Sequence, residues 1–257
     1  GFLGPNGAGK TTTVRMIAGV LPPTRGTVEI DGVNLFDEEI SHRPHIGYLP
    51  ENNPIYDDMT VEEFLRMWAN LKHIPDAIQQ ERIDDAVKSA GLDDVFYRPI
   101  SELSKGYRQR TGLAQAILSQ PDILLLDEPT EGLDPNQRND IHRLIKGLGK
   151  KRTVIICSHV LPEITKMCDR VLIINNGQVV ADSPTKDLNT LNQGETQYEV
   201  VLEGSKVKTT LEGLKSVTKV DRVKEDVGSR YIVSVDSDRD LRLELFDLAK
   251  SKKWKLY

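Results

Sequence analysis

A phosphate-binding loop is the clearest chemical feature of this sequence. The stretch GPNGAGKT at residues 4–11 contains a glycine, four residues, a second glycine, a lysine and a threonine, which is the spacing of a phosphate loop. Glycines allow successive backbone N–H groups to point into one concavity, and a helix that follows aims its positive end at the same anion. The sequence predicts a nucleotide site lined by Asn6, Gly7, Ala8, Gly9, Lys10, Thr11 and Thr12.

Two residues of this loop have distinct expected roles. The ammonium of Lys10 is expected to contact the β- and γ-phosphates, and the hydroxyl of Thr11 is expected to bind Mg²⁺. The alternative is a chance glycine turn before a helix, which average residue frequencies would produce in roughly 1 % of chains of this size. The pattern therefore favours nucleotide binding.

A pair of carboxylates follows an apolar run further along the chain. Asp127 and Glu128 come directly after ILLL at 123–126, and ligands of open α/β sheets bind at the carboxyl ends of such strands. We expect Asp127 to hold Mg²⁺, and Glu128 to polarise the water that attacks the γ-phosphate. An isolated Asp-Glu pair is more often solvated, but the phosphate loop upstream favours the catalytic interpretation.

His159 occupies the corresponding position after the next apolar run, TVIICS at 153–158. A histidine after a strand is usually structural or solvated. Because this one follows the strand after the carboxylate pair, we expect it to reach the γ-phosphate and sense its presence. The remaining histidines lack such a setting and are predicted to be surface residues: His42, His45, His73 and His142.

Composition restricts the class of protein. The chain has 257 residues, of which 38 % are hydrophobic and 28 % charged, and its net charge is −5. This charge does not favour nucleic acid as a partner, and the two cysteines cannot form a disulfide framework, which indicates a reducing cytosol. No apolar run has membrane-spanning length. Gly1 reads as the middle of a strand, so we expect that an N-terminal segment with further strands is missing.

The order of apolar runs predicts the fold class. Solid apolar strands alternate with helical segments from the phosphate loop onward, as in a mostly parallel sheet covered on both faces. Val61–Leu92 and the segment after Ser104 are predicted to be helical, and NNG at 175–177 to be a hairpin turn. We expect a nucleotide-binding domain at residues 1–190, with a mostly helical part at about 58–120.

A second, smaller domain is expected at residues 195–257. Its shorter apolar runs predict the order βαββαβ, which suits a ferredoxin-like α+β domain. This region carries no recognisable motif chemistry. We expect it to be a packing or dimer-stabilising domain, with a regulatory role as the alternative.

Four stretches in order resemble the ATP-binding subunit of ABC transporters: GPNGAGKTT, LSKGYRQR, ILLLDEP and CSH. The resemblance covers about residues 1–185 and implies a P-loop ATPase fold with ATP and Mg²⁺ as cofactors, in which the helical part at about 58–120 is a helical subdomain. LSKGYRQR resembles the family signature Leu-Ser-Gly-Gly-Gln, with Lys105 and Tyr107 as departures. The family usually carries Gln where this sequence has Glu51, which is still expected to bind the metal because carboxylates ligate Mg²⁺.

The resemblance also implies partners. Family members form head-to-tail dimers in which the signature of one subunit faces the phosphate loop of the other, so Ser104, Gly106 and Asp134 are expected to complete the site of a second copy. Integral membrane permease subunits are the other expected partners, which implies a peripheral position on the inner face of the cell membrane. The sequence is most similar to bacterial exporter subunits named for gliding motility and multidrug export.

Two other functions remain open at this stage. A soluble ABC ATPase of translation or DNA repair would carry two cassettes, a coiled-coil insertion or a basic face, and none of these is evident. A module that senses ATP without hydrolysing it would lack the carboxylate or the histidine, yet Glu128 and His159 are both present. A transport ATPase, and an exporter in particular, is therefore the preferred hypothesis.

Overall fold

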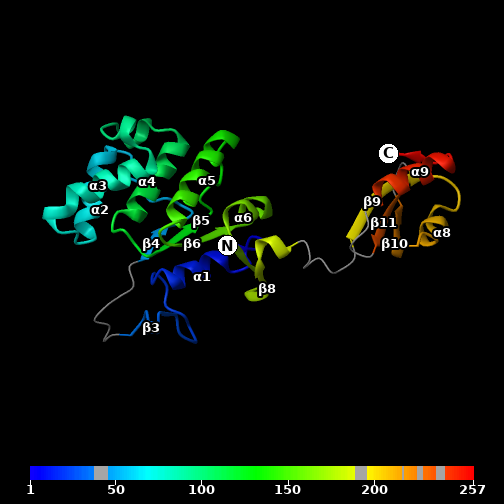
Figure 1. The fold of residues 1–257 in the computed structure, drawn as a ribbon, viewed down its shortest axis with the longest axis horizontal. Helices are drawn as coiled ribbons and strands as arrows, with labels where there is room; N and C mark the ends of the chain where they lie inside the picture. Colours follow the sequence, from blue (N-terminus) through cyan, green and yellow to red (C-terminus); the bar gives the residue numbers. More distant parts are fainter. Residues whose placement is uncertain (38–45, 189–195, 216, 225–227, 236–240) are drawn as a thin grey trace. The chain divides into compact units, whose positions relative to one another are not determined.

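The computed structural model describes residues 1–37, 46–188, 196–215, 217–224, 228–235 and 241–257. These residues form two compact units, Gly1–Thr185 and Lys186–Tyr257, coloured along the chain in Figure 1. The boundary predicted between residues 190 and 195 lies outside the described residues, as do His42 and His45. Within the described ranges, no helix combines the length and apolar character needed to cross a bilayer.

A six-stranded sheet forms the centre of the first unit, in the order β4-β5-β6-β1-β7-β8. Only β8 runs antiparallel to its neighbour, which confirms the predicted mostly parallel sheet. The strands are β1 (Phe2–Leu3), β4 (Ile46–Leu49), β5 (Ile123–Asp127), β6 (Thr153–Ser158), β7 (Arg170–Asn175) and β8 (Gln178–Pro184). Asn176 and Gly177 make the predicted hairpin turn, both with positive φ. A separate hairpin joins β2 (Glu29–Ile30) to β3 (Val33–Asn34).

Helices cover both faces of this sheet. Figure 1 shows α1 on one side of the strands and α5 and α6 on the other. Their bounds are α1 (Lys10–Ile17), α5 (Pro135–Gly149) and α6 (Leu161–Met167). Val14 of α1 packs against a buried cluster that includes Phe2, Leu125 and Cys157 from three adjacent strands. The helix that follows the phosphate loop is thereby fixed to the centre of the sheet.

Three helices lie between β4 and β5 in the chain: α2 (Val61–Leu71), α3 (Asp76–Ala90) and α4 (Lys105–Ile117), with short 3-10 turns at Asp93–Val95 and Ile100–Glu102. The stretch Val61–Leu92 was predicted to be helical, and the structure forms two helices there, α2 and α3. His73 has a φ of 53°, and Pro75 stands at the N-cap of α3, where a proline ring blocks continuation of the preceding helix. A capping box between Thr60 and Glu63 starts α2.

The second unit contains β9 (Thr196–Glu203), α8 (Val207–Glu212), β10 (Val217–Lys224), β11 (Ser229–Val235), α9 (Arg242–Ser251) and β12 (Lys255–Leu256). The strands form one sheet in the order β10-β11-β9-β12, and all neighbours are antiparallel. This is the predicted βαββαβ order. The first two strands, β9 and β10, are not neighbours in the sheet, because the third strand, β11, lies between them.

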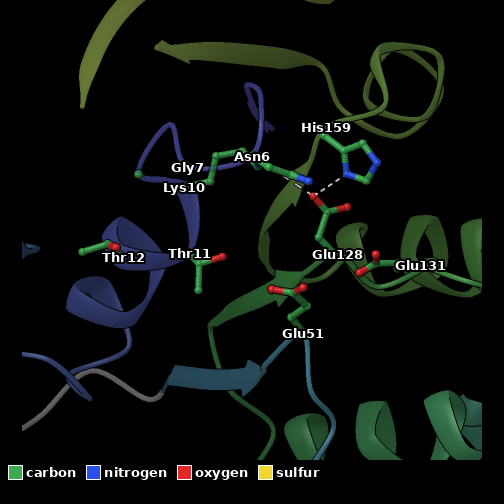
Figure 2. A pocket seen from close by; sticks show the side chains of 10 residues that line it. Asn6, Gly7, Lys10, Thr11, Thr12, Glu51, Glu128, Glu131 and His159 are labelled. Carbon is green, nitrogen blue, oxygen red and sulfur yellow. Dashed lines mark hydrogen bonds and ion pairs between the residues drawn. The ribbon is translucent and has the colours of Figure 1, made fainter. Parts of the chain in front are cut away.

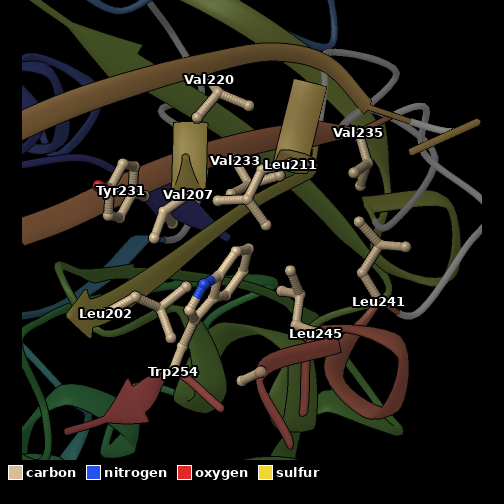
Figure 3. Close-up of a cluster of buried hydrophobic side chains, with 11 residues drawn as sticks. Leu202, Val207, Leu211, Val220, Tyr231, Val233, Val235, Leu241, Leu245 and Trp254 are labelled. Atoms are coloured by element: carbon tan, nitrogen blue, oxygen red, sulfur yellow. The ribbon is translucent and has the colours of Figure 1, made fainter. Parts of the chain in front are cut away.

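An apolar cluster holds the second unit together. Figure 3 shows Trp254 among Leu202, Val207, Tyr231 and Leu245, which come from the sheet and both helices. Gly204 lies directly against the indole: a Cβ atom added there would lie 2.1 Å from Cδ1 of Trp254. The absence of a side chain at this position therefore allows the indole to close the cluster.

The Gly204 contact gives a stability prediction. Gly204→Ala should lower the free energy of unfolding of the second unit by about 1–3 kcal/mol, since overpacking forces side chains off their rotamers. Chemical denaturation followed by tryptophan fluorescence measures this loss. Gly213→Ala is the matched control, because its added Cβ would meet nothing closer than 3.4 Å. Equal stability of the two variants would contradict the assigned packing.

Candidate active site

The loop between β1 and α1 has the backbone that its glycines predict. Gly7 and Gly9 have φ values of 79° and 105°, in the region that favours glycine. A Cβ atom on Gly4 would lie 2.2 Å from the carbonyl oxygen of Ile174. The loop is also tied to the β7–β8 hairpin, because the N–H of Gly177 donates to the carbonyl of Ala8 over 2.9 Å. The close approach of Gly4 to Ile174 and the hydrogen bond between Ala8 and Gly177 therefore fix the curvature of the loop.

A pocket of about 310 Å³ opens beside this loop. Figure 2 shows side chains from the loop, from the end of β4 and from the segments after β5 and β6 around it. The lining residues are Asn6, Gly7, Gly9, Lys10, Thr11, Thr12, Glu51, Glu128, Glu131 and His159. Most of the predicted nucleotide and catalytic residues therefore meet at one cavity. Ala8 and Asp127 are buried and do not line it.

Lys10 supplies a buried positive charge to the pocket. Its Nζ donates to the carbonyl oxygens of Gly4 and Pro5 over 2.7 and 3.2 Å and lies 4.0 Å from Oε1 of Glu128. The carbonyls hold the ammonium within its own loop, and Glu128 balances its charge. A bound phosphate group would offer this ammonium further anionic oxygens.

Glu128 and His159 form a pair on the wall of the pocket. Nδ1 of His159 lies 2.9 Å from Oε1 of Glu128, as drawn in Figure 2. Asp127 and Cys157 are register partners in the parallel strands β5 and β6, so the segments that follow leave the sheet side by side. Glu128 has a φ of 46°, a left-handed conformation that costs about 1–3 kcal/mol for a residue other than glycine.

Asp127 fits a divalent cation. Its side chain is 0 % exposed, and neither carboxylate oxygen has a hydrogen-bond partner among the described residues. Burial raises the pKa of this carboxyl, the carboxylates of Glu51 and Glu128 raise it further, and the neighbouring Thr11 hydroxyl opposes the shift. These oxygen donors suit Mg²⁺. The described chain has no ready-made site of three or more His, Cys, Asp or Glu, so phosphate oxygens and water would complete the coordination.

The remaining predicted residues lie away from this pocket. Ser104 caps α4 by accepting from the N–H of Tyr107, and Asp134 caps α5 by accepting from the N–H groups of Asn136 and Gln137. A Cβ atom on Gly106 would lie 2.9 Å from the Gln137 side chain. The starts of α4 and α5 are therefore in contact, and neither contributes to the phosphate pocket of its own chain.

Two features differ from what the sequence indicated. Glu131 lines the pocket, although it was not singled out; its position three residues after Glu128, in a turn closed by its own N–H to the Glu128 carbonyl, is the signal that was missed. His142 was predicted to be a surface residue, and this was wrong. It is buried on α5, and burial lowers the pKa of its imidazole.

The match to a protein-family model agrees with this geometry. Residues 1–131 match the family described as ABC transporter. The chain is 35 % identical over 237 residues to the ABC transporter ATP-binding protein YhcH of Bacillus subtilis, an alignment that spans 91 % of this chain and 76 % of the relative. It is also 38 % identical over 202 residues to the bacitracin transport ATP-binding protein BcrA of Bacillus licheniformis.

The second alignment spans 78 % of this chain and 65 % of BcrA, which is therefore the longer protein. Among solved structures, the chain resembles a dimeric ATP-binding cassette, MJ0796, bound to ADP and Pi in a post-hydrolysis state. That likeness has a TM-score of 0.63 and 25 % sequence identity, and covers 72 % of this chain and 84 % of the other.

The buried carboxylate of Asp127 gives a prediction for the protein without nucleotide. Asp127→Asn should raise the melting temperature at neutral pH, because it removes a buried charge that lacks a hydrogen-bond partner. A carboxyl whose pKa is raised in the folded state loses its contribution to stability as pH rises through that pKa. The advantage of the variant should therefore grow from acid, near the ordinary Asp value of about 3.9, toward neutral pH.

Thermal unfolding across this pH range measures the effect, with Asp94→Asn on the exposed turn after α3 as control. Mg²⁺ and ATP together should stabilise the wild type and not Asp127→Asn. The metal assignment would be contradicted if Asp127→Asn melted at a lower temperature than the wild type at neutral pH. It would also be contradicted if Mg²⁺ and ATP raised the melting temperatures of the variant and the wild type equally.

Proposed function

Because this chain belongs to the ABC transporter family, we propose that it is an ATP-binding subunit that hydrolyses ATP to drive transport through membrane subunits. The observation that carries the proposal is the 2.9 Å contact between Glu128 and His159 on the wall of a phosphate-loop pocket. A nucleotide-sensing module needs the loop alone. A carboxylate paired with a histidine beside the loop lysine suits the cleavage of the terminal phosphate.

The arrangement suggests how the reaction proceeds. The loop N–H groups and Lys10 bind the β- and γ-phosphates. Because His159 contacts Glu128 through Nδ1 and Oε1, its Nε2 is left for the γ-phosphate, and Oε2 of Glu128 is left for the attacking water. Glu128 accepts the proton of that water as it attacks phosphorus. Mg²⁺ held by Thr11, Asp127 and Glu51 would neutralise charge on the phosphate oxygens.

A second copy of the chain would complete the site. Ser104 and Gly106 lie at the start of α4, where the helix presents N–H groups and a positive end. In a head-to-tail dimer these groups and Asp134 would face the ATP held by the other subunit. ATP then joins the two surfaces, and loss of the γ-phosphate releases them. The dimeric form of the structural neighbour MJ0796 supports this arrangement.

The direction of transport is a further part of this proposal. We propose an exporter of the gliding-motility and multidrug group. Similarity to the bacitracin transport protein BcrA and to the probable multidrug ABC transporter ATP-binding protein YbhF of Escherichia coli supports transport of small toxic compounds. Its ATPase subunits would dock on integral membrane permease subunits at the inner face of the cell membrane. The transported molecule would be recognised by those permease subunits.

The dimer model and the catalytic role of Glu128 are tested together. Glu128→Gln should lower the turnover number at least about 100-fold, since general base catalysis contributes about 10²–10⁴-fold. It should also accumulate a dimer with ATP and Mg²⁺, visible by size-exclusion chromatography with light scattering. Glu102→Gln, which alters an exposed partner of Arg98, is the control and should behave as the wild type. A monomeric Glu128→Gln protein with ATP would refute the dimer, and undiminished turnover would refute the base.

The transport role has a separate test. The tagged chain, isolated from its native membranes in detergent, should copurify with a protein that has several membrane-spanning helices. Recovery with ribosomes or nucleic acid instead would favour the soluble ABC ATPase and contradict the transport assignment.

A further inference from the structure

A buried hydrogen bond links the segments that follow the two catalytic residues. Oγ1 of Thr130 donates to Oε2 of Glu163 over 2.6 Å. Thr130 is 2 % exposed and Glu163 is 6 % exposed. Thr130 comes two residues after Glu128, and Glu163 comes four residues after His159 at the start of α6. The bond therefore joins the same two chain segments as the Glu128–His159 contact, and its two side chains are buried.

Glu163 is held in place by a second partner. Nε of Arg138, on α5, lies 3.2 Å from its other carboxylate oxygen, Oε1. A buried carboxylate persists as a charge only where cations and donors surround it. One turn along α5, His142 has a pKa lowered first by burial and then by Lys166, Arg138 and Lys146, while Glu163 opposes the shift.

The turn at Glu128 requires such support. Its left-handed φ of 46° is strained, and strain of this kind persists where the surroundings over-determine the backbone. The backbone gives two constraints: the N–H of Glu128 donates to the carbonyl of Cys157 over 3.0 Å, and the N–H of Glu131 donates to the carbonyl of Glu128 over 3.2 Å. The Thr130 hydroxyl adds a third that ties the turn to α6.

We propose that Thr130 and Glu163 are positioning residues for ATP hydrolysis: their hydrogen bond keeps the Glu128 turn and the His159 segment in register, so that the carboxylate faces the pocket. Neither side chain lines the pocket, so both act through Glu128. The inference rests on the proposed ATPase function. It predicts that breaking the bond slows the chemical step and leaves nucleotide binding by the phosphate loop intact.

Steady-state ATPase kinetics on the full chain test the bond directly. Thr130→Val keeps the side-chain shape and removes the hydroxyl. It should lower kcat about tenfold or more, which is less than the loss of about 10²–10⁴-fold expected on removal of the base itself, because the base is displaced and not removed. KM for ATP should change less than about twofold. Thr130→Ser restores the hydroxyl and should recover kcat to within about threefold of the wild type. Thr165→Val is the matched control, because this exposed α6 hydroxyl donates only to carbonyls of its own helix; it should leave both constants unchanged.

A double-variant cycle shows whether both residues act through the same bond. If they do, the double variant Thr130→Val with Glu163→Gln should have a kcat no more than about twofold below that of the worse single variant. The reason is that the effects of two residues that act through one bond do not add. Losses that multiply would show independent roles and overturn the proposal. A Thr130→Val enzyme whose kcat equals the wild type, or whose loss Thr130→Ser does not recover, would also overturn it.

The controls separate this inference from the proposed function. If the wild type hydrolyses ATP and Glu128→Gln does not, an unaffected Thr130→Val removes the positioning role and leaves the ATPase assignment standing. If the wild type does not hydrolyse ATP, the proposed function fails, and the positioning role fails with it.

Discussion

The register of two parallel strands is the constraint on which the site depends. Because Asp127 pairs with Cys157, the segments after β5 and β6 leave the same edge of the sheet, and Glu128 meets His159 over 2.9 Å. A shift of one residue would exchange the faces of every side chain on the strand and separate the pair. The apolar residues of β5, buried from Leu124 to Leu126, hold this register, so the core of the sheet determines the geometry of the chemistry.

The same edge concentrates buried charges with few partners in the described chain. Lys10, Asp127 and Glu128 are all buried, yet only Lys10 and Glu128 balance each other. Asp127 keeps two oxygens without hydrogen-bond donors in the described chain, and Glu128 has a strained backbone. Such features are destabilising by themselves and are common at functional sites. A triphosphate with its cation would supply the missing partners, which couples ligand binding to local stability.

Much of the fold and of the phosphate site could be predicted from the sequence, because the signals for them are local. The phosphate loop depends on glycine spacing, the strands on apolar runs, and the βαββαβ order of the second unit on short alternating segments. Glu131 reaches the pocket through a local turn after Glu128. The burial of His142 depends on how α5 packs, which no local pattern encodes. The helical character expected of Val61–Leu92 is present, and the break between α2 and α3 falls at Pro75. The Thr130–Glu163 bond spans 33 positions, so only the fold brings these residues together.

The most direct measurement is an experimental structure of the full chain with Mg²⁺ and a non-hydrolysable ATP analogue. The terminal phosphate should lie within hydrogen-bond distance, about 2.7–3.2 Å, of Nζ of Lys10 and of the His159 ring, with the Glu128 carboxylate facing the position of an attacking water. A nucleotide bound elsewhere, or a Glu128 side chain turned away from His159 and the phosphate, would contradict the central claim that the β5–β6 edge builds the hydrolytic site.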